Sequence, residues 1–102
     1  MREFDYLLDE AAASTLKQIL GEGPADALLY HAGAKPSELG GKPFAEGLTR
    51  ITGSGAVVIE RLILKSFYAE LGVRYEEGHG AFSFGKGIRR ARELEAEGGR
   101  LP

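Results

Sequence analysis

A repeated helix-ending pattern places the strongest constraint on how this chain can fold. Residues 16–23 read LKQILGEG and residues 48–55 read LTRITGSG, so both segments keep the pattern L-x-x-I-x-G-x-G. A Leu and an Ile three positions apart lie on one helix face, and glycine is favoured just after a helix because it adopts positive φ easily. The pattern therefore predicts two helix–turn–helix pairs, over 3–33 and 43–72. It leaves open whether the two pairs superpose.

Apolar periodicity extends this prediction to a mainly α fold, a compact bundle of about five helices. The expected helices cover 3–20, 24–33, 43–52, 55–71 and 84–97. Pro24 and Pro43 suit the first position of the second and third helices, and Ser54 and Ser83 are expected N-caps of the fourth and fifth.

The segment 55–71 is apolar almost all round, so we expect it to be the central helix of the bundle. Its narrow polar arc is expected to hold Arg61, Lys65 and Tyr68. Residues 73–84 alternate between apolar and polar, which favours a small two-stranded element, with an extended loop as the alternative.

Length and composition restrict the class of protein further. A chain of 102 residues suggests a single domain, 1–102, and a net charge of −2 argues against a nucleic-acid binder. Cysteine is absent, which excludes disulfides and thiolate metal sites, and no apolar run is long enough to span a membrane. The N-terminus lacks a signal-peptide pattern, so a cytoplasmic protein is expected. The absence of Asn and the single Gln are typical of a heat-adapted organism, or of a GC-rich genome.

Glu60 is the most unusual polar residue, because it lies among apolar neighbours of the 55–71 helix. An unpaired buried carboxylate is costly, so Glu60 either lines a pocket or forms a structural ion pair, for example with Arg50, or lies at the helix edge. Tyr30 and His31 are further candidate polar groups of such a pocket. His31 and His79 are isolated from other ligand-type residues, so no metal and no cofactor is expected.

The last predicted helix carries a basic cluster in its first half, formed by Lys86, Arg89, Arg90 and Arg92. Acidic residues follow in its second half, an order that opposes the helix dipole. The cluster is either an ordinary solvated face or a surface for an acidic partner, an anion or a neighbouring subunit.

Several runs of this chain resemble a known family. They are LKQILGEGPADALLYH at 16–31, FAEGL at 44–48, GSGAVVIE at 53–60 and FYAELG at 67–72. They resemble the small archaeal helical domain called the Nitrosopumilus output domain over about residues 5–95. Some members of that family follow receiver domains of two-component systems, so the resemblance implies a signalling or adaptor role. Residues 24–48 are also similar to vinyl-reductase-type regulatory domains that bind ligands.

These observations give three hypotheses of function. The leading one is a non-enzymatic interaction or signalling-output module, because the residues form no nucleophile–base or metal-ligand pattern. The second is a small-ligand sensor with an apolar pocket beside the 55–71 helix. The third is a DNA-binding helix–turn–helix regulator that reads through Arg89, Arg90 and Arg92. The apolar 55–71 helix also predicts a protein partner, most simply a second copy in a homodimer.

Overall fold

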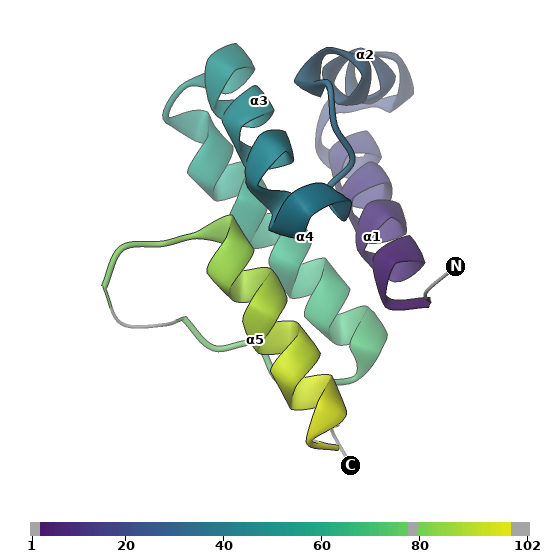
Figure 1. Ribbon diagram of the computed structural model, residues 1–102. Helices are drawn as coiled ribbons and strands as arrows, with labels where there is room; N and C mark the ends of the chain where they lie inside the picture. Colours follow the sequence, from purple (N-terminus) through teal and green to yellow (C-terminus); the bar gives the residue numbers. More distant parts are fainter. Residues whose placement is uncertain (1–2, 78–79, 99–102) are drawn as a thin grey trace.

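The chain folds as a helical bundle, as predicted. The computed structural model describes residues 3–77 and 80–98, and these form five α-helices and one short 3-10 helix (Figure 1). The α-helices are α1 (Glu3–Leu20), α2 (Glu22–Ala32), α3 (Lys42–Thr52), α4 (Gly55–Leu71) and α5 (Phe84–Ala96), and the 3-10 helix is η1 (Glu38–Gly41). The predicted bounds 3–20 and 55–71 are confirmed, and the other three helices differ from prediction by one or two residues at an end.

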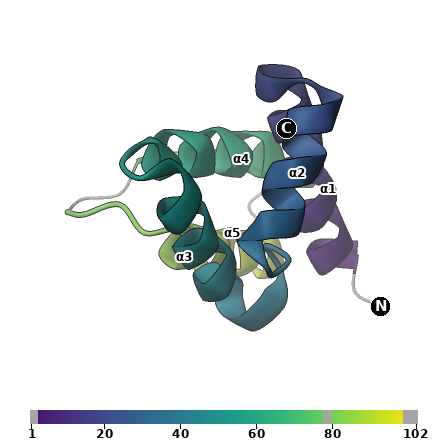
Figure 2. The ribbon, with the colours of Figure 1, turned by 90° about the horizontal axis from the view of Figure 1, so that it is seen from above.

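Helix α4 is the centre of the bundle, as its apolar composition predicted. It packs against α1, α3 and α5, and α2 covers α1 and α3 (Figures 1 and 2). The α4 side chains Ile63, Leu64 and Phe67 are almost fully buried. Phe4 of α1 meets Phe67 edge to face, with ring centroids 4.9 Å apart, which fixes the start of α1 against α4.

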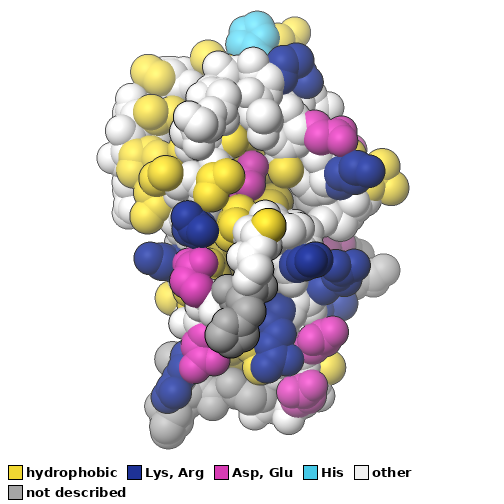
Figure 3. All heavy atoms as spheres, turned by 90° about the vertical axis from the view of Figure 1, so that its left-hand side faces the viewer, with side chains coloured by type: hydrophobic (Ala, Val, Ile, Leu, Met, Phe, Trp, Pro, Cys, Tyr) yellow, Lys and Arg dark blue, Asp and Glu magenta, His cyan; other side chains and the backbone are white. Residues whose placement is uncertain are grey.

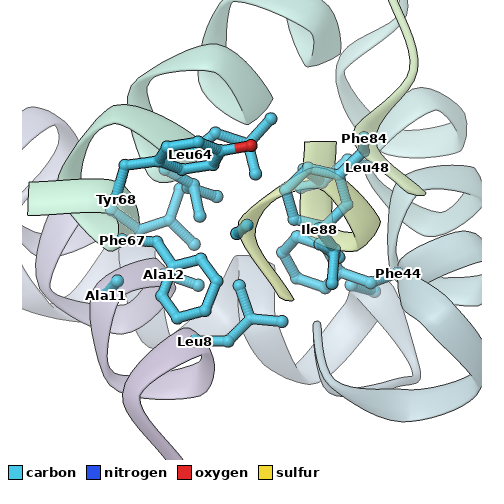
Figure 4. Packing of buried hydrophobic residues seen from close by; sticks show 14 of the residues in the cluster. Leu8, Ala11, Ala12, Phe44, Leu48, Leu64, Phe67, Tyr68, Phe84 and Ile88 are labelled. Atoms are coloured by element: carbon cyan, nitrogen blue, oxygen red, sulfur yellow. The ribbon is translucent and has the colours of Figure 1, made fainter. Parts of the chain in front are cut away.

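The predicted polar arc of α4 is wrong at Tyr68. This residue is only 3% exposed and lies in the packed cluster of Figure 4. Its hydroxyl donates to the Gly87 carbonyl at 2.7 Å. Helix α5 covers this side of α4 because Gly87 lets it approach closely: a Cβ there would lie 2.4 Å from a Leu64 methyl carbon. The exposed side of α4 instead carries Val57, Val58 and Leu62.

The predicted two-stranded element near 73–84 is also wrong. The described residues of this connection, 73–77 and 80–83, contain no strand. Its aromatic side chains pack individually: Tyr75 meets Tyr68 edge to face at 5.0 Å, and the Arg61 guanidinium lies 4.9 Å from the Phe82 ring centre. The alternating pattern therefore marks separate packing points on α4. His79 lies outside the described residues.

The two copies of the repeated pattern share their local structure. Gly21 and Gly53 both have positive φ, 88° and 61°, and each donates its N–H to the carbonyl four residues earlier. The pattern's Leu is fully buried in both copies, whereas its Ile is 45% exposed at Ile19 and 43% exposed at Ile51. The flanking helices are 18 and 11 residues long in the first pair but 11 and 17 in the second. Two helix–turn–helix pairs are present, and their superposition stays a prediction.

The helix starts follow the sequence predictions in part. Ser83 caps α5 as predicted, since its hydroxyl accepts from the Lys86 N–H at 3.3 Å. Ser54 does not cap α4, because its backbone is already helical (φ −64°, ψ −17°) and its side chain makes no capping bond. Pro24 is the third residue of α2, which begins at Glu22, and Pro43 is the second residue of α3.

Two contacts hold the connector between α2 and α3 in place. Ser37 donates its backbone N–H and its hydroxyl to the Asp9 carboxylate of α1, at 3.0 and 2.8 Å. Gly41 is buried against α5, where a Cβ would lie 2.5 Å from the Ile88 Cδ1 atom. The connector is therefore fixed at its middle and at its end before α3, and it brings η1 beside the start of α5.

Candidate functional site

An open groove of about 890 Å³ lies between η1, α3, the start of α4 and the start of α5. Most of its lining residues come from α3 and α5, two helices that lie about 40 positions apart in the sequence. The lining residues, which together define the Glu60 groove, are Leu39, Gly40, Lys42, Ala45, Glu46, Thr49, Arg50, Val57, Glu60, Phe82, Ser83, Phe84, Gly85, Lys86 and Arg89. Its volume is in the range of small-molecule sites, roughly 300–1,000 Å³.

Glu60 is the buried polar group of this groove. Its side chain lies on α4 and the residue is only 5% exposed, yet the described residues offer it no hydrogen bond and no ion pair. Every fully buried side-chain oxygen of the described residues has a hydrogen-bond partner. Because the Glu60 carboxylate has no partner, its oxygens are not fully buried, and they open toward the groove. Burial raises the pKa of Glu60 from 4.5 to about 7, because the charged form loses water contacts.

The alternative ion pair between Glu60 and Arg50 is not formed. The Arg50 guanidinium donates instead to the His31 carbonyl at 3.0 Å, near the end of α2. This bond satisfies one of the carbonyls that a helix C-terminus leaves without an intrahelical partner. Arg50 therefore joins α3 to α2 at the edge of the groove, and Glu60 keeps no neutralising partner within the described chain.

The edge of the Glu60 groove is mainly basic. Lys42 of α3 and Lys86 and Arg89 of α5 are exposed, and no described acidic side chain pairs with them. Glu46 is the acidic side chain of this edge. Apolar wall is supplied by Val57, Phe82, Phe84 and Ala45, so the groove combines an apolar lining with unpaired charges of both signs.

Leu39 stands at the edge of the groove in a strained conformation. Its φ of 46° and ψ of 47° lie in the left-handed region of backbone conformation, which residues other than glycine rarely adopt. The same side chain is 83% exposed, so its strain is not compensated by burial of its own surface. Strained backbone that packing does not explain occurs often at binding sites.

Tyr30 and His31, the other predicted pocket groups, lie outside the lining of the groove. Their rings meet edge to face at 5.2 Å on the surface of α2, where Tyr30 is 80% exposed. Of the three predicted pocket residues, the fold therefore brings only Glu60 into a groove.

The predicted basic cluster of α5 is divided between two surroundings. Arg92 faces α1, where its guanidinium lies 4.1 Å from the Phe4 ring centre and 3.6 Å from the Asp5 carboxylate. Arg90 lies 3.4 Å from Glu93 on its own helix. Lys86 and Arg89 instead line the Glu60 groove. The four cations thus do not form one free surface, and Arg92 is the member of the cluster that links α5 to α1.

A second hollow, of about 600 Å³, lies on the other side of Phe82, between α4, α5 and the connection that joins them. Here Glu77 accepts from Arg61 at 3.3 Å and from the Tyr75 hydroxyl at 3.0 Å. Burial, with a further contribution from Glu77, raises the pKa of Tyr75 to about 12. Arg61 and Glu77 therefore form an ion pair in this hollow, whereas Glu60 has no such partner in the described chain, and Lys86 lines both hollows.

Sequence reasoning missed most of the groove. Only Glu60, Lys86 and Arg89 were candidates, while Leu39, Lys42 and Phe82 had no distinguishing sequence signal. In the described part of the chain, His, Asp and Glu form no group of three that could hold a metal ion. None of the helices described is long and apolar enough to cross a bilayer.

No protein-family model matches the chain, and searches of curated proteins and of solved structures find no match. The resemblance to the archaeal output domain therefore stays a prediction.

Proposed function

We propose that this chain is a non-enzymatic binding module whose ligand site is the Glu60 groove, as in the small-ligand sensor hypothesis. One observation carries the proposal: the carboxylate of Glu60, a residue only 5% exposed, has no partner in the described residues and opens into a groove of ligand size. Burial of an unpaired carboxylate costs stability, so a purely structural role would favour an apolar residue at this position. A ligand that bonds to Glu60 would supply the missing partner.

Two further features support this proposal. The apolar wall offers contact area to a ligand body, and the exposed Leu39 extends that wall at the edge of the groove. The backbone around the groove is well held, because Ser37 and Arg50 tie the connector and α3 to neighbouring helices. A site with a fixed backbone loses little conformational entropy on binding.

A ligand screen by thermal unfolding tests the proposal. The library contains small amines, carboxylates and neutral compounds, and each is tested on the wild type, Glu60→Gln and the control Glu70→Gln, which changes an exposed carboxylate of the same helix. A ligand at 100 times its Kd adds about 2.7 kcal/mol, which raises Tm by about 10 °C for a domain of this size. We expect at least one compound to stabilise the wild type and Glu70→Gln clearly more than Glu60→Gln. A screen without any stabilising compound, or equal stabilisation of all three proteins, would overturn the proposal.

A second candidate function, self-association as a homodimer, follows from an apolar patch that adjoins the Glu60 groove and shares Val57 with it. Ile51, Val57, Val58 and Leu62 are between 37% and 58% exposed near the α3–α4 turn. Hydrophobic side chains gather on the face shown in Figure 3. Such an exposed apolar surface suits a symmetric pair of identical chains, in which the same patch meets itself.

Light scattering at several protein concentrations tests the homodimer. A dimer has twice the monomer mass of 11.0 kDa, and Val58→Glu is expected to return it to the monomer mass. The matched control is Ile19→Glu, which adds the same charge at an exposed Ile of α1. A mass of 11.0 kDa at all concentrations would end this proposal.

The composition supports two proposals about the setting of this protein, a cytoplasmic location and a heat-adapted archaeal source. Their support is the lack of cysteine and asparagine and the resemblance given above. Mesophilic domains unfold at about 45–65 °C, so a Tm well above that range is expected. A Tm within it would contradict the heat-adapted source.

A further inference from the structure

From the charges of the Glu60 groove we infer the chemical class of its ligand: an amphoteric small molecule, with an amine or guanidine for Glu60 and an anionic group for Lys42, Lys86 and Arg89, joined by an apolar body. The inference rests on the proposed function, since it specifies what the same groove binds. Its basis is that one groove holds an unpaired acid and unpaired bases that do not neutralise one another.

The basic end of the ligand is inferred from Glu60. The fold has already removed part of the water around this carboxylate, and the described cations do not offset the resulting rise in its pKa to about 7. A ligand ammonium or guanidinium in contact with it would form an ion pair shielded from water, which is stronger than an exposed pair. A purely anionic ligand would instead meet a second negative charge, or require Glu60 to stay protonated.

The anionic end is inferred from the edge of the groove. Lys42 and the α5 side chains Lys86 and Arg89 are exposed and free of acidic partners in the described chain, whereas Glu46 is the acid that lies among them. The N-terminus of α5 adds positive potential at the same place, because Gly85 of its first turn also lines the groove. A carboxylate or phosphate group on the ligand suits this edge.

The apolar body follows from the wall between the two ends. Val57, Phe82 and Ala45 line the groove, and Leu39 projects into solvent beside it. A groove of about 890 Å³ exceeds what a single amine or carboxylate group fills. The ligand therefore has an aliphatic or aromatic part that separates its two charged groups.

Calorimetric titration with three probes of equal chain length tests this inference. The probes are 8-aminooctanoate, octylamine and octanoate, and the 6- and 10-carbon amino acids vary the separation of the charges. We expect the best amino acid to bind the wild type at least about tenfold more tightly than either singly charged probe, the equivalent of one added ion pair. Glu60→Gln should weaken the two amines about tenfold and leave octanoate unchanged or tighter.

A double variant separates the two ends of the ligand. Lys42→Gln/Arg89→Gln should weaken the amino acid and octanoate but leave octylamine unchanged, and Lys17→Gln/Lys65→Gln, which lies outside the groove, should change none of them. Circular dichroism of each variant verifies that it is folded.

The failure of the inference is distinct from the failure of the proposed function. If octanoate binds as tightly as the amino acids, or Glu60→Gln weakens all probes equally, the amphoteric ligand is wrong while the groove remains a binding site. If all probes fail but the thermal screen finds a ligand that depends on Glu60, the ligand class is again wrong. If neither experiment finds a ligand, both proposals fail.

Discussion

Replacement of Glu60 by Gln should make this protein more stable at neutral and alkaline pH. Gln has nearly the same shape as Glu but cannot ionise, so the change removes the buried charge and leaves the packing of α4 intact. The pKa of Glu60 in the folded protein is about 7, against an ordinary value of 4.5. At about 1.4 kcal/mol for each pKa unit, this difference corresponds to about 3 kcal/mol, of which water in the open groove offsets a part. We expect about 2–3 kcal/mol.

The sign and the pH range of this effect follow from proton linkage. Below pH 4.5 the carboxyl is protonated in both the folded and the unfolded chain, so Glu60 adds no pH dependence. Between pH 4.5 and about 7 the folded chain binds more protons, so the wild-type stability falls as the pH rises. Above about pH 7 both forms are ionised and the full loss remains.

Urea unfolding of the wild type and Glu60→Gln between pH 4 and pH 8.5 measures this effect. The relevant quantity is the difference in the free energy of unfolding, because the other titrating groups are common to both proteins. Those that line the groove with Glu60 are Lys42, Glu46, Arg50, Lys86 and Arg89. The difference should rise by about 2–3 kcal/mol across this range, with most of the rise between pH 4.5 and 7. A difference that does not vary with pH would refute the burial argument.

Three further substitutions test how the helices pack. Gly47→Ala should destabilise the protein by about 1–3 kcal/mol in urea unfolding, because its Cβ would lie 2.3 Å from a backbone oxygen at the end of α2. Gly23→Ala in the first turn of α2 meets no atom within 4 Å and should be neutral or stabilising, and similar losses at both sites would contradict this reasoning. Tyr68→Phe leaves the Gly87 carbonyl without its hydroxyl donor and should cost about 1 kcal/mol, whereas an unchanged Tm would show that the bond adds nothing. Arg92→Lys keeps the charge but loses the planar guanidinium that lies over the Phe4 ring of α1, so the free energy of unfolding should fall by up to about 1 kcal/mol. Unchanged stability would indicate that Arg92 acts through its charge alone.

The helices were predictable because their signals are local. Gly21 and Gly53 end helices in the structure as their sequence context predicted, and Ser83 caps α5 through its own side chain. The errors at Tyr68 and at residues 73–84 have another origin. The environment of Tyr68 depends on α5, whose close approach to α4 at Gly87 leaves no room for a side chain there, and such a contact between distant segments has no periodic signature.

The candidate site was predictable only where a residue differed in polarity from its neighbours in the sequence. Glu60 is a carboxylate on an apolar helix face, so the sequence alone singled it out, and the fold places it in a groove. Lys42 and Leu39 lie in an ordinary polar connector and helix start, and their position opposite α5 follows from how the connector is anchored at Ser37. Tyr30 does not differ from its sequence neighbours in this way, and its side chain is exposed to solvent.

Replacement of Glu60 by Gln should change the stability of the fold and the affinity for a ligand in opposite directions. A carboxylate in a structural ion pair would lose stability when replaced, because its cation would remain without a partner. Glu60 has no such cation in the described chain, so Glu60→Gln should raise stability at pH 8 while it weakens the binding of amine-containing ligands. The free energy that the fold loses by holding this charge is then recovered when a ligand cation meets it. A variant that lost both stability and binding at pH 8 would show that Glu60 supports the fold and that the groove is lined by a structural residue.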